Sequence, residues 1–168
     1  MKTRRAIPAL LALLWLGCSE TTGKPDGAGE APNYARAMAR GENPRRGEVI
    51  ALGIGDATYE IEVAGQGDGL SLGLMFRPRM GADEGMWFEF PNEDFQRFWM
   101  RDTKIPLSIA FVDSKGRIGN IEDMVPYDES HTHSKRKVKY ALEMNRSWFV
   151  KKGIEAGDEI LIGRVRKK

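Results

Sequence analysis

The sequence predicts a single α+β domain, mainly β, with about seven or eight short strands and two short helices. From Gly47 onward, short stretches that alternate between apolar and polar residues, or are apolar throughout, are separated by Gly, Pro and Asp. Helix signals occur in two places, and neither an internal repeat nor a second domain is indicated. Few helices beside many strands are typical of the α+β class.

Eight stretches are predicted to be strands, because each has strand-like patterning between turn-forming residues. In the second stretch, TYEIEV, alternation predicts that Tyr59, Ile61 and Val63 face one way and that Glu60 and Glu62 face the other. The eight stretches are 48–54, 58–63, 85–90, 96–100, 107–113, 117–125, 138–144 and 159–165.

Turn and cap signals locate one hairpin and both helices. The segment VDSKGRI carries a Lys115-Gly116 turn that is expected to close a hairpin. The stretch DGLSLGLMF is predicted to begin a helix with Asp68 as its cap, and NRSWFVKKG a second helix, with Asn145 as N-cap and Gly153 at its end. The letters GLSLG also match the pattern of a serine-hydrolase nucleophile, but the chain lacks the helices of that scaffold, so a helix start is favoured.

The N-terminal segment is predicted to direct export. Residues 1–17 have a basic head followed by the uncharged run AIPALLALLWLG, which ends just before Cys18. The run is shorter than the roughly 20 apolar residues of a spanning helix. Cys18, the only cysteine, is the expected lipidation site; because Trp15 stands where the lipoprotein pattern usually has leucine, an ordinary signal peptide is the alternative. Ser19 follows Cys18 in place of aspartate, which favours the outer membrane, facing the periplasm.

Composition divides the rest of the chain into a tether and a domain. Residues 18–46 are predicted to be flexible, because they are rich in Gly, Pro, Ala and charge and almost lack large apolar residues. Residues 47–168 are the predicted domain. Removal of residues 1–17 changes 26 basic and 24 acidic residues to 23 and 24, so the charge balance does not indicate nucleic acid as a partner. With Cys18 lipidated, the fold must rely on burial rather than disulfides.

Polar residues in apolar surroundings are the first candidates for a ligand site. Arg77 follows GLMF, Thr103 follows FWMRD, and Glu143 lies within YALEM. A buried charge needs a partner or must be neutralised, so Arg77 and Glu143 could be paired with each other. The sequence does not decide between a structural ion pair and the floor of a polar pocket.

The stretch RFWMRDTKIPL adds an aromatic candidate. Alternation along a strand sends Phe98 and Met100 to the core and Trp99 to the opposite face. Residues 102–106 are predicted to form a turn into the next strand. Trp99 and Thr103 are therefore the residues of this stretch that are expected to face a ligand.

A metal site is a weaker alternative. The letters HTH place His131 and His133 on one side of an extended chain, where Asp128 or Glu129 would have to supply a third ligand. The run DESHTHSKRK around them is favoured to be an exposed loop. No cofactor is predicted.

Five stretches, read together, resemble the bacterial and archaeal family known as domain of unknown function 192. They are GLMFR at 73–77, DEGMWFEF at 83–90, FWMRDTKIPLSIAFVDSKGRI at 98–118, YALEMN at 140–145 and GIEAGDEI at 153–160. The resemblance implies a compact β-rich domain, often exported, with no established activity. Its recurrent elements map onto Gly73, Leu74, Met75, Arg77, Phe98, Trp99, Met100, Thr103, Leu142 and Glu143.

The favoured function is a non-catalytic binding or accessory module, held at the membrane by a lipid anchor, with an envelope ligand or protein as partner. The chain shows no coherent set of nucleophile, base and acid, which supports this interpretation. One alternative is an envelope-acting hydrolase or transferase, in which Arg77, Thr103 and Glu143 converge in an open cleft. The other is a periplasmic copper- or zinc-handling protein that uses His131 and His133.

Overall fold

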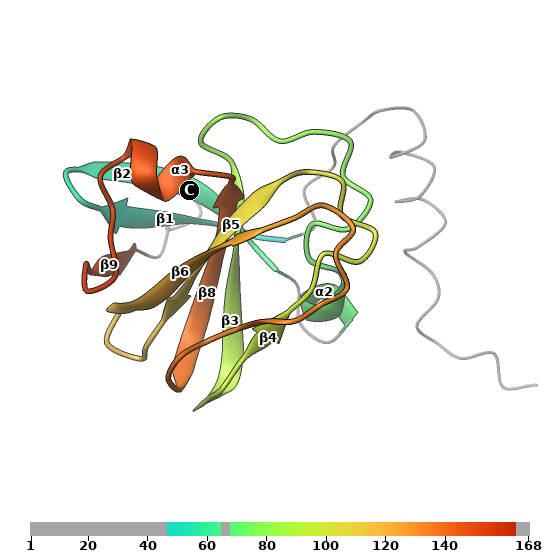
Figure 1. Ribbon diagram of the computed structural model, residues 1–168. Coiled ribbons are helices and arrows are strands. Elements are labelled where there is room, and N and C mark those ends of the chain that lie inside the picture. Colours follow the sequence, from blue (N-terminus) through green and yellow to red (C-terminus); the bar gives the residue numbers. More distant parts are fainter. Residues whose placement is uncertain (1–46, 65–67, 164–168) are drawn as a thin grey trace, which may run out of the picture.

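A computed structural model describes residues 47–64 and 68–163 of the protein. The predicted signal peptide, Cys18 and the tether lie outside these residues. Seven strands form one sheet in the order β6-β5-β8-β3-β2-β1-β9, and β4 and β7 form a separate two-stranded ribbon (Figure 1). The elements are β1 (Val49–Ile54), β2 (Ala57–Val63), α2 (Asp68–Leu72), β3 (Gly85–Asp94), β4 (Arg97–Phe98), β5 (Leu107–Val112), β6 (Ile118–Met124), β7 (Thr132–His133), β8 (Val138–Asn145), α3 (Trp148–Lys151) and β9 (Ile160–Gly163).

The seven-stranded sheet curls until its two edges meet. β2 runs parallel to β3, and the other neighbouring pairs are antiparallel. At the edges, Arg117 forms a bridge with Glu159, and the Ile118 and Ile160 backbone N–H groups each donate a hydrogen bond of 2.8 Å across the seam. Curling of this kind protects edge strands, whose unpaired backbone groups would otherwise promote aggregation.

Two separate groups of buried apolar residues lie on opposite faces of the sheet. The first, which we call the inner cluster, is enclosed by the curl and by α3 (Figure 1). Its buried members are Leu52, Ile54, Ile61, Trp87, Ala110, Val112, Ile118, Leu142, Met144, Trp148, Phe149, Ile154 and Ile160. The second, the outer cluster, comprises Ala64, Leu74, Met86, Phe88, Met100, Ile105, Leu107, Ile109, Phe111, Met124, Val138 and Ala141.

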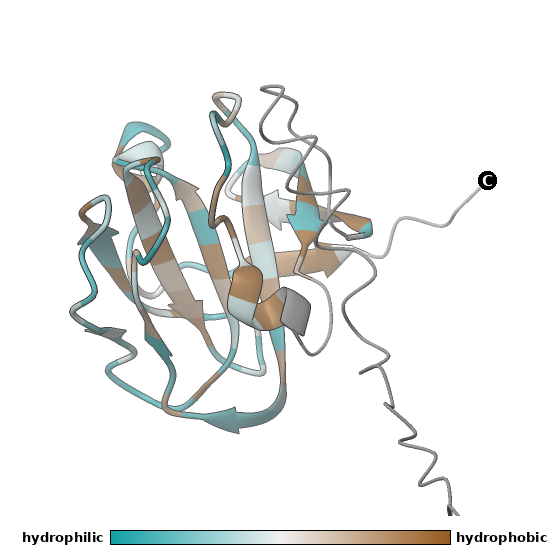
Figure 2. Cartoon of the chain, turned by 90° about the vertical axis from the view of Figure 1, so that its right-hand side faces the viewer, coloured by the Kyte–Doolittle hydropathy of each residue, from teal (hydrophilic) through white to brown (hydrophobic). Residues whose placement is uncertain are grey.

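The outer cluster exists because loops and α2 cover the outside of the central strands. In Figure 2, α2 faces the viewer in front of the sheet and carries brown, hydrophobic residues. All six residues of β5 are buried, since one face of the strand packs into each cluster. A strand that is covered on both faces has a nearly continuous apolar sequence, as LSIAFV does here apart from Ser108.

The structure confirms the predicted fold class and corrects some details. Each predicted strand overlaps an observed one, although only residues 97–98 of QRFWM are paired, with β7 in a segment predicted to be a loop. Gly116 occupies the predicted hairpin turn with φ of 86°. The predicted N-cap Asn145 is wrong: Asn145 ends β8 and donates to the Gly81 carbonyl, and Ser147 occupies the N-cap position of α3.

None of the helices in the described ranges 47–64 and 68–163 is long and apolar enough to cross a membrane.

Candidate functional site

A pocket of about 300 Å³ opens on the outer side of the sheet. Residues 70–75, from α2 and the turn after it, form one side, and the β4 segment with Thr103 forms another. Phe88 and Phe90 of β3 and Glu143 of β8 come from the sheet itself. The pocket is therefore built between the sheet and the segments that cover the outer cluster.

Close packing at the turn after α2 sets the distance between the two sides. Gly73 has φ of 45°, and a Cβ atom placed there would lie 3.3 Å from the Phe88 ring. A side chain at this position would therefore be both strained and crowded. A hydrogen bond of 2.8 Å from the Phe76 N–H to the Asp102 carbonyl then connects this turn to the loop after β4.

The apolar wall of the pocket is a group of packed rings. Phe98 makes edge-to-face contacts with Phe88, Phe90 and Phe111, at centroid distances of 5.0, 6.2 and 5.8 Å. Such pairs stabilise a structure beyond the effect of burial alone. Met100 is buried and Phe98 packs on the outer cluster, so both belong to the core as predicted.

Arg77 is buried, but its ion pair differs from the predicted one. Arg77 Nη2 donates to Glu62 Oε2 at 2.6 Å, and the two side chains are 3% and 5% exposed. Arg77 does not line the pocket. The ion pair suggested with Glu143 is therefore not the one observed. Alternation along TYEIEV placed Glu62 on the face of the strand opposite Ile61, and the pattern did not indicate that this face is buried.

Glu143 is the polar group of the pocket that lies within the sheet. It is 4% exposed, and its neighbours across the ladder are Met86 on β3 and Ile109 on β5, both fully buried. Burial raises the pKa of the Glu143 carboxyl to about 8, an effect that the positive charge of Arg77 partly offsets. Within the described part of the chain, no side chain or backbone group hydrogen-bonds to this carboxyl. At neutral pH, the pocket therefore contains an uncharged carboxylic acid.

Thr103 is buried at the pocket and fixed by the loop around it. Its hydroxyl donates to the Arg101 carbonyl at 3.1 Å, and its own carbonyl accepts a hydrogen bond from the Tyr127 N–H at 3.1 Å. Asp102 and Tyr127 have positive φ values of 51° and 62°. Strained backbone of this kind is often found at functional sites.

Trp99 lies at the rim of the pocket and is 37% exposed. The His131 ring stacks on it at 5.9 Å with an interplanar angle of 9°, and the Arg101 guanidinium lies 5.3 Å from the centre of its ring. The flat face of Trp99 is thus already in contact with two side chains. Of the candidates that the sequence identified, the pocket brings together Trp99, Thr103 and Glu143.

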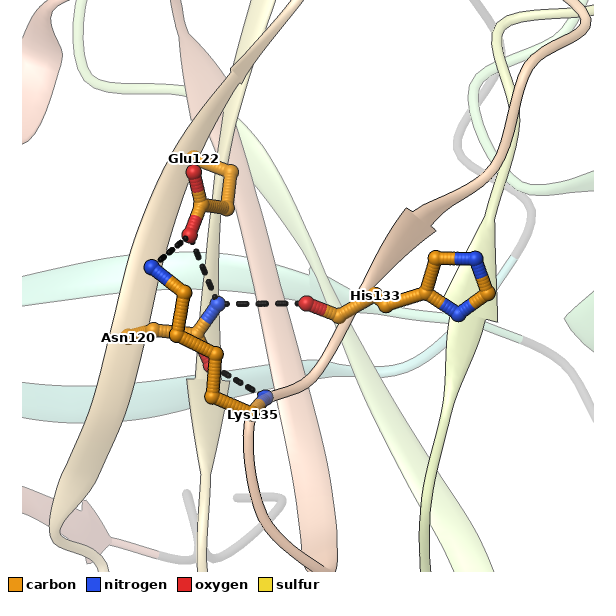
Figure 3. Close-up of polar contacts among 4 residues, drawn as sticks. All are labelled: Asn120, Glu122, His133 and Lys135. Carbon is orange, nitrogen blue, oxygen red and sulfur yellow. Dashed lines mark hydrogen bonds and ion pairs between the residues drawn. The ribbon is translucent and has the colours of Figure 1, made fainter.

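The two histidines do not form a complete metal site in the residues that the structure describes. Their rings lie 6.0 Å apart, and residues 47–64 and 68–163 contain no group of three or more His, Cys, Asp or Glu side chains that could hold a metal ion. The His133 ring points away from the polar network beside it, which receives only its backbone carbonyl (Figure 3). In that network Asn120 donates to Glu122 and to the His133 carbonyl and accepts from the Lys135 N–H.

Sequence reasoning missed Glu62 and most of the apolar wall. Glu62 had the same pattern as an exposed strand residue, because TYEIEV alternates regularly. The ring of Phe90 and the α2 residues Leu70 and Ser71 also line the pocket without a sequence signal of their own. Their role depends on contacts between segments that are far apart in the chain.

Comparison with known proteins places the chain in a family. Residues 50–162 match the profile of domain of unknown function 192 (DUF192), described as an uncharacterised ACR. The chain belongs to this family, as its resemblance predicted. No curated protein matches the chain.

Two solved structures share the fold. A protein of Sinorhizobium meliloti 1021, described as a candidate transcription regulator, is 30% identical, with a TM-score of 0.65, and the match covers 72% of this chain and 97% of that one. A protein of unknown function from Novosphingobium aromaticivorans DSM 12444 is 34% identical, with a TM-score of 0.62, and the match covers 67% and 83% of the two chains.

Proposed function

We propose that this member of the DUF192 family is a lipid-anchored envelope protein whose domain binds a small ligand in the pocket without transforming it. The observation that carries the proposal is Glu143, a buried carboxyl that faces the pocket without a hydrogen bond from the described residues. A hydrogen bond between a ligand and this carboxyl would contribute roughly 0.5 to 1.5 kcal/mol, or about 1.5 to 3 kcal/mol where one of the two groups is charged, so a ligand with a matching polar group would be favoured.

The remaining walls suit a ligand with an apolar body. Phe88, Phe90 and Phe98 present rings to the pocket, and Leu74 adds an aliphatic side chain. Small-ligand sites typically combine such walls with a few polar groups, and cover about 300 to 1,000 Å³. Here Glu143 and the Thr103 hydroxyl would orient the ligand.

Binding is tested with small probes that share one ring and differ in their polar group: benzyl alcohol, benzamide, benzoate and benzylammonium. The processed full-length protein in detergent is titrated with each and followed by NMR. At least one probe should shift the signals of Glu143 and Phe98. Leu70→Trp, which fills the pocket, should abolish the shifts, and Val150→Trp, on the exposed surface of α3, should preserve them. Failure of all four probes to shift pocket signals would contradict the proposal.

The proposed lipid anchor and cellular location are inferred from the sequence around Cys18. We propose that the chain is exported, cleaved before Cys18 and lipidated there, and that the outer membrane holds it facing the periplasm. Growth with a lipid analogue should label the wild-type chain and leave Cys18→Ser unlabelled. A Cys18→Ser chain that remains on membranes as fully as wild type would count against a lipid anchor.

A second candidate function is acid catalysis on an envelope component. The observation that favours it is again Glu143, because a carboxyl that keeps its proton to about pH 8 is suited to act as a general acid. Isolated envelope material would be incubated with wild type and with Glu143→Gln, and soluble products compared by mass spectrometry. Products that appear with wild type alone would favour an enzyme over a binding module, and identical profiles would favour binding without catalysis.

We do not extend the description of the Sinorhizobium meliloti protein to this chain. Residues 18–168 carry 23 basic and 24 acidic residues, and affinity for nucleic acid depends mainly on positive charge. The proposed partners are therefore the membrane and an envelope ligand, without nucleic acid.

A further inference from the structure

Among the described residues, the buried acidic and basic side chains on the outer face of the sheet are unequal in number. Two carboxyl groups, those of Glu62 and Glu143, and one guanidinium, that of Arg77, are each less than a tenth exposed. Arg77 donates to Glu62 at 2.6 Å, which leaves Glu143 as the buried acid without a cation of its own in the described part of the chain. With its proton Glu143 adds no charge, and a cationic ligand that replaced this proton would leave the charge of the site unchanged.

The space in front of Glu143 can receive such a charge. Glu143 lies at the sheet, and the rings of Phe88, Phe90 and Phe98 also line the pocket. Aromatic rings attract organic cations, and a cation beside a carboxylate gains a charge-assisted hydrogen bond. A neutral ligand would have the hydrogen bond without the attraction between charges.

Other charged groups around Glu143 do not occupy this position. Arg77, from the loop after α2, is held by Glu62 of β2. Arg97 of β4 lines the pocket, but its side chain is exposed, so water and salt screen its charge. The neighbours on β3 and β5, Met86 and Ile109, and the residues of α2 that line the pocket are uncharged.

We propose that the ligand of this pocket is an organic cation with a compact ammonium group, which the Glu143 carboxylate binds while the aromatic rings surround its apolar part. This inference rests on the ligand-binding function proposed above. Binding would be coupled to a proton: the ammonium enters with its charge, the Glu143 carboxyl releases its proton to solvent, and an ion pair forms. The net charge of the pocket then remains zero.

The test compares benzylammonium with benzyl alcohol, which has nearly the same shape and no charge, on the processed full-length protein in detergent. Benzylammonium should bind at least about tenfold more tightly than the alcohol. Its affinity should rise as the pH increases from 6 to 8, by up to about tenfold per pH unit, because less work is then needed to remove the proton from Glu143. Calorimetry in two buffers of different ionisation enthalpy should detect release of close to one proton at pH 6.

Two variants separate this inference from the proposed function. Glu143→Gln should reduce the affinity for benzylammonium at least about tenfold and leave that for benzyl alcohol within about twofold. Glu60→Gln, the same substitution at an exposed position outside the pocket, should retain the preference for the cation. If the alcohol binds as tightly as the ammonium, or if affinity for the ammonium falls with rising pH, the inference is wrong while a ligand site remains. If neither probe perturbs pocket residues, the proposed function fails as well.

Discussion

The inner and outer clusters share the strands β3, β5 and β8, yet they differ in what they bury. The inner cluster is apolar and is closed by Trp148 and Phe149 of α3. The outer face includes Glu62, Arg77 and Glu143, all buried, and next to them a pocket. Apolar burial stabilises a fold, whereas buried charge usually costs free energy unless it is paired. We infer that the inner cluster holds the domain together and that the outer layer is specialised for a ligand.

The largest difference between the two faces should be a dependence of the free energy of unfolding on pH, which Glu143 on the outer face causes. The folded Glu143 carboxyl keeps its proton to about pH 8, whereas an unfolded glutamate releases it near pH 4.5. The native state therefore binds more protons between these values, and the free energy of unfolding should fall by up to about 1.4 kcal/mol per pH unit as the pH rises through this window. Glu143→Gln lacks this loss, so urea unfolding should show the variant gaining stability relative to wild type from pH 5 to 8.

The exposed Glu60→Gln variant is the control for this measurement, because it removes a carboxyl of the same kind outside the buried layer. Parallel stability curves for wild type and Glu143→Gln across pH 5 to 8 would show that Glu143 is not a buried acid with a raised pKa.

Truncating one aromatic side chain on each face of the sheet should have different effects. The truncation in the inner cluster should mainly lower stability, and the one at the pocket should mainly reduce ligand binding. Trp87 points into the inner cluster and is 1% exposed, so Trp87→Ala should cost about 3 to 5 kcal/mol in the free energy of unfolding. Phe98 on the outer face is half-buried, and Phe98→Ala should cost about 1 to 2 kcal/mol. NMR titration should nevertheless show that Phe98→Ala, and not Trp87→Ala, loses the benzyl probes. The comparison fails if both variants lose stability and binding to the same degree.

Removing one member of the Arg77–Glu62 ion pair should lower the free energy of unfolding more than removing both members. Arg77→Met deprives the buried Glu62 carboxylate of its guanidinium and should cost about 3 kcal/mol, measured by urea unfolding. The double variant Arg77→Met with Glu62→Met removes both charges and should recover much of this loss, since two apolar side chains can replace a buried pair. A double variant that is less stable than Arg77→Met would mean that the pair contributes net stability.

The smallest effect is expected at an ion pair on the surface. Lys135 Nζ lies 2.8 Å from Glu122 Oε1 at the surface, and its side chain is 72% exposed, so Lys135→Met should change the free energy of unfolding by less than about 1 kcal/mol. Asn120→Ala, in the same network, should cost about 1 to 3 kcal/mol, because it withdraws partners from the His133 carbonyl and the Lys135 N–H (Figure 3). Equal losses for the two variants in thermal unfolding would contradict this ranking.

Patterns within single segments predicted the strands and several core residues. The period of two along RFWMRDTKIPL correctly assigned Met100 to the core and Trp99 to an exposed position. The Lys115-Gly116 turn was predicted from its residues, because a hairpin needs a positive φ that glycine adopts easily. By contrast, Asn145 looked like an N-cap, but strand β8 continues to that residue and uses its side chain to hold Gly81.

Relations between segments decided the candidate site. Glu62 and Glu143 both lie on strands with apolar neighbours, and neither segment reveals which of them receives Arg77. That choice depends on the turn after α2, which carries Arg77 toward β2 and leaves the carboxyl on β8 facing the pocket.

By itself, the sequence determined the class of the fold, the positions of its strands and the family to which the chain belongs, because backbone periodicity and turn chemistry are local properties. Only the tertiary structure decided that the central strands are covered on both faces, that Arg77 pairs with Glu62, and that Glu143 lies at a pocket without an ion pair from the described residues. The reason is physical: burial and the pairing of charges depend on distances between segments that are remote in the chain, and those distances are set when the sheet curls and the outer loops close over it.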